Sequence, residues 1–445
     1  MNRSLPRGFV WGAATSAYQI EGAWQEDGRS ESIWDRFSHT PGRIRDGSTG
    51  DVACDHYHRW EDDVALMAEL GLTAYRFSVA WPRILPDGRG EVNAKGLAFY
   101  DRLVDRLLEA GIEPFLTLYH WDLPQTLQDA GGWPERSTHE AFVEFADRVS
   151  ARLGDRVRHW ITVNEPWVAA SHGYQSGVHA PGRRDEDAYV ASAHHMLLAH
   201  GRSVEAIRAN CAGAEIGIAV DLAPQTPLSD SAADRNAATL ADGRVNRWFL
   251  DPLVGRGYPQ DVVEADQVEL RCVRPGDLET IAAEVDFLGV NYYSHNVVGE
   301  GVLDPPDDRQ WYTEMGWKVY PEGMTETLRR LHADYRFPSY YVTENGAAFR
   351  DTVDECGQVI DADRIRYLDR HLEAIRIAAE SGVPVRGNFV WSLLDNFEWG
   401  EGMTKRFGLV FVDFDDQRRI VKASGDWYRR AAAANALPPN EEDAP

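Results

Sequence analysis

The chain has 445 residues, 43% of them hydrophobic, and its 46 basic and 71 acidic residues give a formal net charge of −25. Such an acidic chain repels phosphate backbones and anionic lipid surfaces, so we expect no nucleic acid and no membrane as partners. No apolar stretch reaches the roughly 20 residues of a membrane span, and the N-terminus lacks the pattern of a signal peptide. These features predict a soluble, cytoplasmic protein.

The four cysteines lie far apart and form no CxxC pair. They are Cys54, Cys211, Cys272 and Cys356. This spacing is typical of free thiols in a reducing compartment and favours neither a disulfide framework nor a zinc site.

Eight apolar, strand-like segments recur along the chain, with amphipathic helical patterns between them. They are residues 9–19, 73–81, 112–121, 158–166, 215–222, 285–293, 340–346 and 386–396. Several are almost continuously apolar, as expected of a parallel sheet covered on both faces. The alternation predicts a single α/β domain over residues 1–435, a (β/α)8 TIM barrel with extended βα loops, followed by a disordered tail over 436–445. A doubly wound sheet is the rival, but no GxGxxG turn follows the first strand.

Each predicted strand is apolar through its middle and becomes polar at its carboxyl end. The polar residues there are Gln19, Arg76, His120, Asn164, Glu165, Asp221, Asn291, Tyr293, Glu344 and Asp395. In barrel enzymes this end of the strands is the mouth at which active sites are built. We therefore expect Glu165 and Glu344 to project into one pocket from opposite sides.

Two facing carboxylates are the arrangement that hydrolyses glycosidic bonds, one as a proton donor and the other as a nucleophile or base. Arg76 and Tyr293 are expected opposite Glu344, where they would stabilise its ionised form. Glu165 has no obvious cation beside it, which suits the acid/base, and the proline that follows favours an extended backbone there. The amide of Asn164 is expected to bind a sugar hydroxyl.

Aromatic residues near the strand ends add a second indication. Most of the 15 Trp residues are expected to fill the core. The rings expected near the pocket are Trp121, Trp317, Trp391 and Trp399. In the stretch WSLLDNFEW, Glu398 adjoins one of these rings, and this pairing of a carboxylate with a flat ring favours a sugar site.

Five motifs carry a family resemblance. They are FVWGAATSAYQIEG, TVNEP, NYYS, YVTENG and WSLLDNFEWGEGMTKRFG, in that order along the chain. From about residue 8 to about residue 428, the sequence resembles β-glucosidases of glycoside hydrolase family 1.

The resemblance implies a retaining, double-displacement mechanism that needs no cofactor or metal. In it Glu344 is the nucleophile, held by Tyr293 and Arg76, and Glu165 is first the acid and then the base. The residues implied to bind substrate are Gln19, His120, Asn164, Glu398 and Trp399 around the glycone, Trp391 as its stacking platform, and Trp317 on the aglycone side. The resemblance also implies a cis peptide bond between Trp391 and Ser392.

Comparison within the family narrows the range of substrates that the resemblance implies. Glu165 is absent from members resembling thioglucosidases, so its presence indicates O-glycosides. Members that act on phosphorylated sugars lack a carboxylate matching Glu398 and have Tyr at the position of Phe407, so a neutral sugar is indicated. Lys405 is shared by both groups. Met403 stands near the expected entrance, where an aromatic residue is frequent, and leaves the aglycone preference open.

Several functions remain compatible with these residues. The first is removal of terminal β-D-glucosyl residues, with tolerance for β-fucosides and β-galactosides, from a small-molecule β-glucoside or a β-linked oligosaccharide. A transglycosylase would use the same residues with a sugar or alcohol as acceptor. A non-catalytic sugar-binding barrel would be expected to lack one carboxylate. The oligomeric state is not indicated by the pattern.

A metal-dependent hydrolase is the remaining alternative, because the chain contains two histidine pairs. His56 and His58 form an HxH motif that precedes a helical pattern, and His194 and His195 are adjacent within another. Metal ligands must converge on one point. We interpret these histidines as structural or surface residues.

Overall fold

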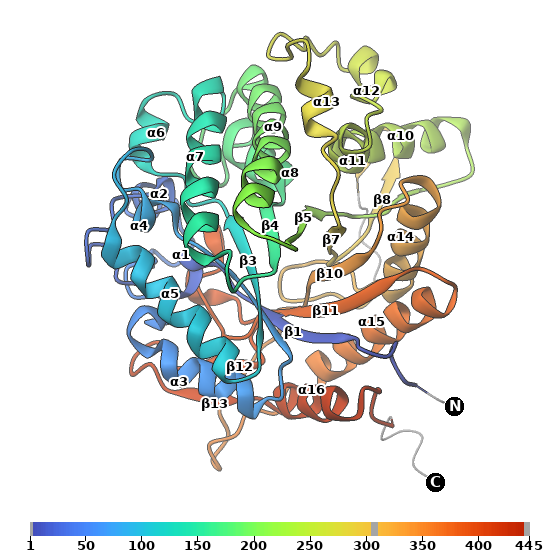
Figure 1. Cartoon of the computed structure of the whole chain (residues 1–445). Coiled ribbons are helices and arrows are strands. Elements are labelled where there is room, and N and C mark those ends of the chain that lie inside the picture. The colour runs from blue at the N-terminus through green and yellow to red at the C-terminus, as the bar shows by residue number, and fades with distance from the viewer. Residues whose placement is uncertain (1–2, 304–309, 440–445) are drawn as a thin grey trace.

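A computed structural model describes residues 3–303 and 310–439. Eight parallel strands close into a barrel in the order β1-β11-β10-β7-β5-β4-β3-β2, and helices surround it (Figure 1). The strands are β1 (Val10–Ala14), β2 (Ala74–Ser78), β3 (Glu113–Tyr119), β4 (His159–Asn164), β5 (Glu215–Asp221), β7 (Phe287–Asn291), β10 (Tyr340–Asn345) and β11 (Val385–Trp391). Each overlaps one of the eight predicted segments, which confirms the predicted TIM barrel.

The longer helices follow the barrel strands, and most of them surround the barrel (Figure 1). They are α3 (His56–Glu69), α5 (Ala94–Glu109), α7 (Arg136–Leu153), α9 (Glu186–Asn210), α10 (Ala232–Asp242), α14 (Pro321–Asp334), α15 (Ala362–Glu380) and α16 (Ala423–Ala434). In α5, Phe99, Leu103 and Leu107 are buried on one face, which is the apolar stripe that a helix presents to a core. Gly111, just beyond its end, has a φ of 73°, a left-handed conformation that glycine adopts readily.

Shorter elements lie in the connections between strands and helices. The helices are α1 (Ala17–Ile20), α2 (Ile33–Ser38), α4 (Trp81–Ile84), α6 (Gln125–Asp129), α8 (Pro166–Ala170), α11 (Trp248–Leu253), α12 (Gln260–Ala265) and α13 (Asp277–Ile281), with single π or 3-10 turns at Ser171–Gln175, Gly243–Arg247 and Trp399–Thr404. The strands β6 (Gln225–Pro227), β8 (Asn296–Gly299) and β9 (Val302–Leu303) form one small sheet, and β12 (Val410–Val412) pairs with β13 (Arg419–Val421). The βα connections are thus extended, as predicted.

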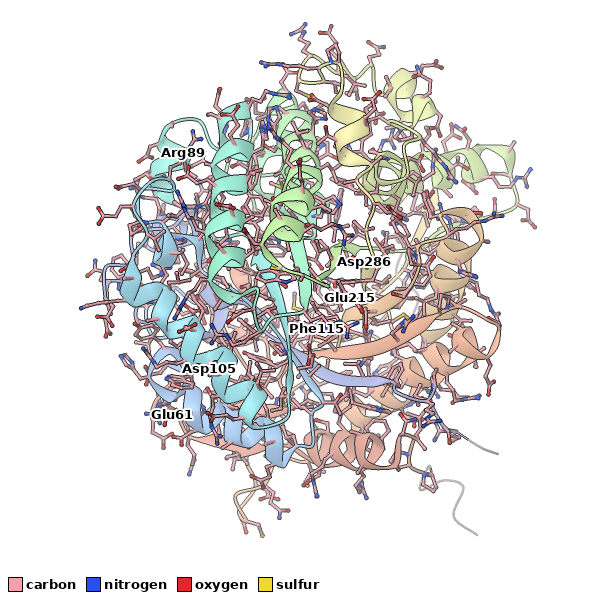
Figure 2. All side chains as sticks on the ribbon, viewed as in Figure 1. Glu61, Arg89, Asp105, Phe115, Glu215 and Asp286 are labelled. Carbon is pink, nitrogen blue, oxygen red and sulfur yellow. The ribbon has the colours of Figure 1, made fainter. Side chains whose placement is uncertain are left out.

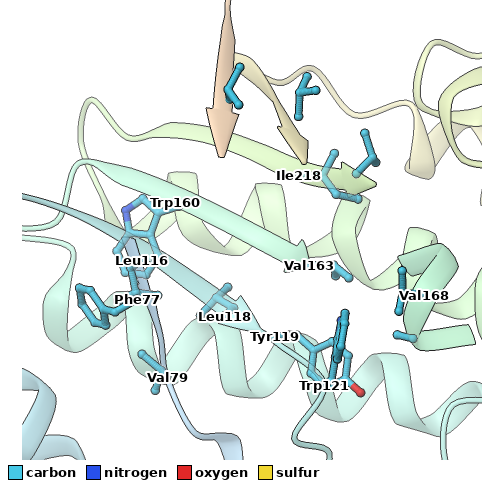
Figure 3. Packing of buried hydrophobic residues seen from close by; sticks show 14 of the residues in the cluster. Phe77, Val79, Leu116, Leu118, Tyr119, Trp121, Trp160, Val163, Val168 and Ile218 are labelled. Carbon is cyan, nitrogen blue, oxygen red and sulfur yellow. The ribbon is translucent and has the colours of Figure 1, made fainter. Parts of the chain in front are cut away.

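Alternate residues of each strand face the two sides of the barrel wall. Leu116 of β3, Trp160 of β4 and Ile218 of β5 belong to the large core packed between strands and helices (Figure 3). Phe115, the residue before Leu116, belongs instead to a second cluster. Its ring lies 5.2 Å from the ring of Tyr341 on β10, so this cluster spans the interior.

Large side chains fill the barrel near the amino ends of its strands. The ring of Phe115 also lies 4.7 Å from Phe389 of β11, and Phe287 at the start of β7 lies 5.2 Å from Tyr341. Figure 2 shows Phe115 near Glu215 and Asp286, which stand at the amino ends of β5 and β7. Because side chains fill this end of the barrel, a ligand can bind only at the carboxyl ends of the strands, where the active sites of such barrels usually lie.

The two ends of the described chain lie close together (Figure 1). Ser4 forms a bridge with Ala436, and the N–H of Leu437 donates to the carbonyl of Arg3 at 3.1 Å. Leu437 is buried. The sequence predicts that Ala436 and Leu437 begin a disordered tail. Both are ordered instead, because the apolar side chain of Leu437 packs in the core. Residues 440–445 of that tail lie outside the described residues.

All four cysteines are free thiols. Within residues 3–303 and 310–439, no helix is both long and apolar enough to cross a bilayer.

Candidate active site

A cavity of about 860 Å³ opens at the carboxyl ends of the barrel strands, and both Glu165 and Glu344 line it. Glu165 follows β4 and Glu344 is the second-last residue of β10, and two strands, β5 and β7, separate them around the barrel. The other predicted site residues that line the cavity are His120, Tyr293, Trp317, Trp391, Glu398 and Trp399. Gln19, Arg76 and Asn164 do not line it, but all three are buried and contact residues that do.

Glu344 is held by a cation and a phenol. Its Oε1 accepts a hydrogen bond from the guanidinium of Arg76, and its Oε2 accepts one from the hydroxyl of Tyr293 at 2.7 Å. Arg76 is fully buried, in the middle of β2 and not at its end. It also donates to Oδ1 of Asn164 at 2.6 Å. Both oxygens of the Glu344 carboxylate therefore accept hydrogen bonds, one from a cation and one from a phenol.

Glu165 stands in a different environment. It is buried, and its Oε1 accepts a hydrogen bond from the amide of Asn291 at 2.7 Å. Burial raises the pKa of Glu165 well above its usual value, and the negative charges of Glu344 and Asp221 raise it further. The carboxyl group is therefore stabilised in its protonated form, as a proton donor requires.

The backbone at Glu165 differs from the sequence-based expectation. The residue is not extended but left-handed, with φ of 48° and ψ of 65°. It forms the sharp turn between β4 and the helix α8, which begins at Pro166. Its N–H donates to the carbonyl of Ala219 on β5, and its carbonyl accepts from the N–H of Ala169 in α8. These bonds to two neighbouring elements hold the residue in a conformation that the following proline alone would disfavour.

Two strand-end residues contribute more than the sequence indicated. Asn291 ends β7, and besides Glu165 it contacts Oδ1 of Asn164 at 3.0 Å and accepts from the hydroxyl of Thr343 at 2.7 Å. Asp221 ends β5 and lines the cavity, and burial followed by the charge of Glu344 raises its pKa to about 7. Their positions were recognised from the pattern, but their partners come from other strands and leave no local signal.

Gln19 reaches the site from a helix. The strand β1 ends at Ala14, and Gln19 lies in α1, so its assignment to a strand end was wrong. Its amide nitrogen donates to the carbonyl of Phe397 at 2.9 Å and lies 3.5 Å from Oε2 of Glu398. Burial, followed by the charge of Glu344, raises the pKa of Glu398 to about 8. An amide and a carboxyl group are thus paired at the cavity wall.

His120 follows β3 and stands between an amide and two indoles. Its Nε2 lies 3.1 Å from the amide nitrogen of Asn164, and its ring stacks on Trp391 and Trp399 at centroid distances of 5.7 and 6.0 Å. Burial lowers the pKa of His120 well below its usual value, and the charge of Arg76 lowers it further. The imidazole is therefore neutral.

The aromatic side chains surround the cavity at different depths. The peptide bond between Trp391 and Ser392 is cis, as the resemblance implied. Trp121 also lines the cavity, and its indole donates to the carbonyl of Asn164 at 2.9 Å. Trp317 comes from the segment before α14 and is only half-buried, with its ring 5.2 Å from that of Tyr293. The cavity therefore has aromatic walls both beside the two carboxylates and farther out.

Two residues expected near the pocket do not line it. The carboxylate of Asp395 is buried against Lys422 at 2.6 Å and Arg406 at 2.7 Å, in an ion-pair cluster behind the loop that follows β11. Met403 packs on the core, and its N–H donates to the side chain of Asp46 at 2.9 Å. The positions of Asp395 and Met403 are therefore set by contacts with residues distant along the chain.

The paired histidines bond to other protein groups. His56 contacts Asp63 at 2.8 Å, His194 contacts Asp277 at 3.0 Å, and Nδ1 of His195 lies 2.9 Å from the carbonyl of Trp133. Nowhere in the described part of the chain do three or more His, Cys, Asp or Glu side chains gather in a way that would hold a metal ion.

A barrel whose mouth holds a carboxylate paired with a cation, and a second carboxyl group kept protonated by burial, defines the class of carboxyl-dependent barrel hydrolases. The sequence model of glycosyl hydrolase family 1 matches residues 1–437. The chain therefore belongs to glycosyl hydrolase family 1.

Named relatives extend over nearly the whole chain. Beta-glucosidase A of Acetivibrio thermocellus is 46% identical over 98% of this chain and 99% of its own length. A bifunctional beta-D-glucosidase/beta-D-fucosidase of Bifidobacterium breve is also 46% identical, over 97% and 99%. The solved structure of a beta-glucosidase from Thermotoga maritima in complex with deoxynojirimycin matches with a TM-score of 0.95 at 45% identity, over 98% of this chain and all of that one.

Proposed function

We propose that the protein is a retaining β-glucosidase that releases terminal, non-reducing β-D-glucosyl residues from aryl or alkyl glucosides and from β-linked oligosaccharides such as those of cellulose. The observation that carries the proposal is the opposed environment of the two carboxyl groups, Glu344 bonded to Arg76 and Glu165 buried without a cation. The names of the relatives support the same activity. Tolerance for β-fucosides is proposed because one relative carries that activity in its name.

In the first chemical step, the ionised Glu344 attacks the anomeric carbon. The bond from that carbon to the leaving oxygen breaks as Glu165 gives this oxygen its proton, so the leaving group departs neutral and the sugar becomes an ester of Glu344. The hydrogen bonds from Arg76 and Tyr293 hold the carboxylate of Glu344 in position for this attack.

In the second step, water replaces the leaving group. Glu165, now ionised, takes a proton from the water as its oxygen attacks the anomeric carbon, and the ester bond to Glu344 breaks. Two inversions at one carbon give net retention. A sugar or alcohol that enters in place of water would give transglycosylation by the same residues.

Around the reacting carbon, we assign the substrate-binding side chains by their place in the cavity wall or, for Gln19 and Asn164, by their contacts to that wall. Gln19, His120, Asn164, Glu398 and Trp399 would bind the hydroxyls of the glucosyl unit, and Trp391 would stack on its apolar face. Trp317, farther out and half-exposed, would contact the aglycone. Carboxyl and amide groups beside flat rings suit a neutral sugar, which presents hydroxyls at its edge and C–H groups on its faces.

The proposal is tested with Glu344→Gly and 2,4-dinitrophenyl β-glucoside. We expect turnover to be lost, and added azide to restore it by forming α-glucosyl azide, because azide occupies the space of the missing carboxylate. Glu355→Gly, at an exposed glutamate, is the matched control and should keep full activity. Proton NMR of the first wild-type product should show β-glucose. An α-anomer as first product would exclude retention.

A further inference from the structure

The outer part of the cavity is lined by three arginines, Arg43, Arg45 and Arg184. This is unexpected in a chain with 71 acidic and only 46 basic residues. They come from two segments, one after α2 and one before α9, that meet at the rim. A Cβ atom built on Gly182 would lie 3.5 Å from the guanidinium carbon of Arg43, so the two segments are in contact.

Two of these arginines keep an uncompensated charge. Nε of Arg45 lies 3.1 Å from a carboxylate oxygen of Glu401, so that pair is neutral. Arg184 donates to the carbonyl of Ser176, at 3.1 Å, and the guanidinium of Arg43 lies 5.1 Å over the ring of Phe37. Within residues 3–303 and 310–439, neither Arg43 nor Arg184 forms an ion pair with a carboxylate.

The wall between these arginines and the reacting groups is aromatic and uncharged. Trp167 stands two residues after Glu165 and lines the same cavity. Its ring lies 5.3 Å from that of His172, whose pKa burial lowers to about 4, so the imidazole is neutral at pH 7. The proton donor stands on the side from which the aglycone leaves. This wall and the arginines beyond it therefore face the aglycone and not the glucosyl unit.

The carboxyl groups deeper in the cavity repel a bound anion only weakly, because they are paired with a cation or protonated. Glu344 is paired with Arg76. Burial raises the pKa of Glu398 to about 8 and that of Asp221 to about 7, so both groups are partly or mostly protonated at neutral pH. The electrostatic potential in the outer part of the cavity is then set mainly by the guanidinium groups of Arg43 and Arg184.

We propose that this arginine-lined rim selects β-glucosides whose aglycone is an aromatic ring carrying a carboxylate. The ring would lie against Trp167, and the carboxylate would be bound by Arg43 and Arg184, because the planar guanidinium group matches a carboxylate in geometry as well as in charge. The inference rests on the proposed glucosidase activity and specifies the substrate class of the same site.

The test compares two substrates that differ only in charge, 4-(β-D-glucopyranosyloxy)cinnamate and its primary amide. The measured quantity is the ratio of kcat/KM for the carboxylate to kcat/KM for the amide. We expect the Arg43→Gln/Arg184→Gln variant to lower this ratio about five-fold relative to wild type, the size typical of two solvent-screened ion pairs. The comparison between proteins cancels the difference in leaving-group acidity. Salt at 0.5 M should lower the wild-type ratio and leave that of the variant unchanged.

The matched control is Arg183→Gln. Arg183 precedes Arg184, does not line the cavity, and pairs with Asp185 at 3.0 Å, so its loss should leave the ratio unchanged. An equal ratio in wild type and the double variant overturns the inference, and so does an equal fall in the Arg183→Gln variant, which would indicate a general field effect. If wild type hydrolyses the amide but not the carboxylate, the inference also fails while the glucosidase proposal stands. If neither compound nor 4-nitrophenyl β-glucoside is hydrolysed, it is the proposed function that fails.

Discussion

The amide nitrogen of Asn291 donates a hydrogen bond to Glu165 at 2.7 Å, while the amide oxygen of the same residue accepts one from Thr343 at 2.7 Å. Thr343 immediately precedes Glu344 on β10, and Asn291 ends the neighbouring strand β7. One side chain therefore connects the acid/base we propose to the strand that carries the proposed nucleophile. The relative position of the two carboxyl groups depends on this amide.

Replacing Glu165 with alanine should have an effect that depends on the leaving group. Alkyl glucosides and cellobiose need a proton on the departing oxygen, so we expect kcat/KM to fall by about 10²–10⁴-fold. With 2,4-dinitrophenyl β-glucoside the phenolate leaves unaided, and the fall should be small. Azide should accelerate this variant by forming β-glucosyl azide. Steady-state kinetics check the result, with Glu401→Ala at the cavity rim as the control. Equal losses on both kinds of substrate would remove Glu165 from the acid role.

Replacing Asn291 with alanine should move the pH profile. Its hydrogen bond stabilises the ionised form of Glu165 and so lowers the pKa of this group. Without the bond the pKa of Glu165 rises, and the alkaline limb of kcat/KM, where the proton donor is lost, should shift to higher pH. Thr343→Val is the matched control, because it removes the hydrogen bond that the amide oxygen of Asn291 accepts and leaves the bond to Glu165. A limb that moves to lower pH, or that moves equally in both variants, contradicts this assignment.

The sequence predicts the barrel well because its signal is local. Each strand is buried on both faces and therefore reads as an apolar run, and the carboxyl ends of parallel strands share one edge, which brings Glu165 and Glu344 to one cavity. That reasoning needs neither the order of the strands nor the partner of any side chain.

The sequence-based predictions that are wrong concern residues whose contacts lie outside their own segment of the chain. Asp395 ends a strand-like run, and this pattern predicts it at the site, but its partner Lys422 lies 27 residues further on. The sequence predicts Gln19 at the end of a strand because the apolar run continues past the end of β1 at Ala14. The left-handed backbone of Glu165 is imposed by bonds to β5 and α8. Tertiary contacts decide each of these features.

The raised pKa of Glu398, about 8, makes a prediction about stability. Between the unfolded value of 4.5 and the folded value, the native state binds more protons than the unfolded state, so stability falls as pH rises through this window. Glu398→Gln removes the ionisation. We expect the Tm of the variant relative to wild type to be about 2 °C higher at pH 8.5 than at pH 5. Differential scanning calorimetry measures the shift, with exposed Glu355→Gln as the control. A difference that is the same at both pH values contradicts the burial of this charge.

The ion-pair cluster behind the loop after β11 predicts a different effect for Lys422→Met. Nζ of Lys422 is buried and lies 2.5 Å from Asp351 and 2.6 Å from Asp395. Removing it leaves two buried carboxylates with one cation fewer, so we expect the free energy of unfolding to fall by about 3–5 kcal/mol. Asp395 lies three residues before Glu398, which we propose binds substrate, so the loop that carries Glu398 should shift, and KM should rise more than kcat falls.

Chemical denaturation and steady-state kinetics check both parts of this prediction. Lys95→Met is the matched control, because Lys95 pairs with Asp27 at 2.9 Å with both side chains exposed, and such pairs contribute little to stability. Adding Asp395→Asn to Lys422→Met should recover part of the lost stability, since it removes one of the unpaired charges. A double variant less stable than Lys422→Met alone would mean that Asp395 is held mainly by Arg406 and the N–H of Gly408. In that case Lys422 would not be the group that positions the loop.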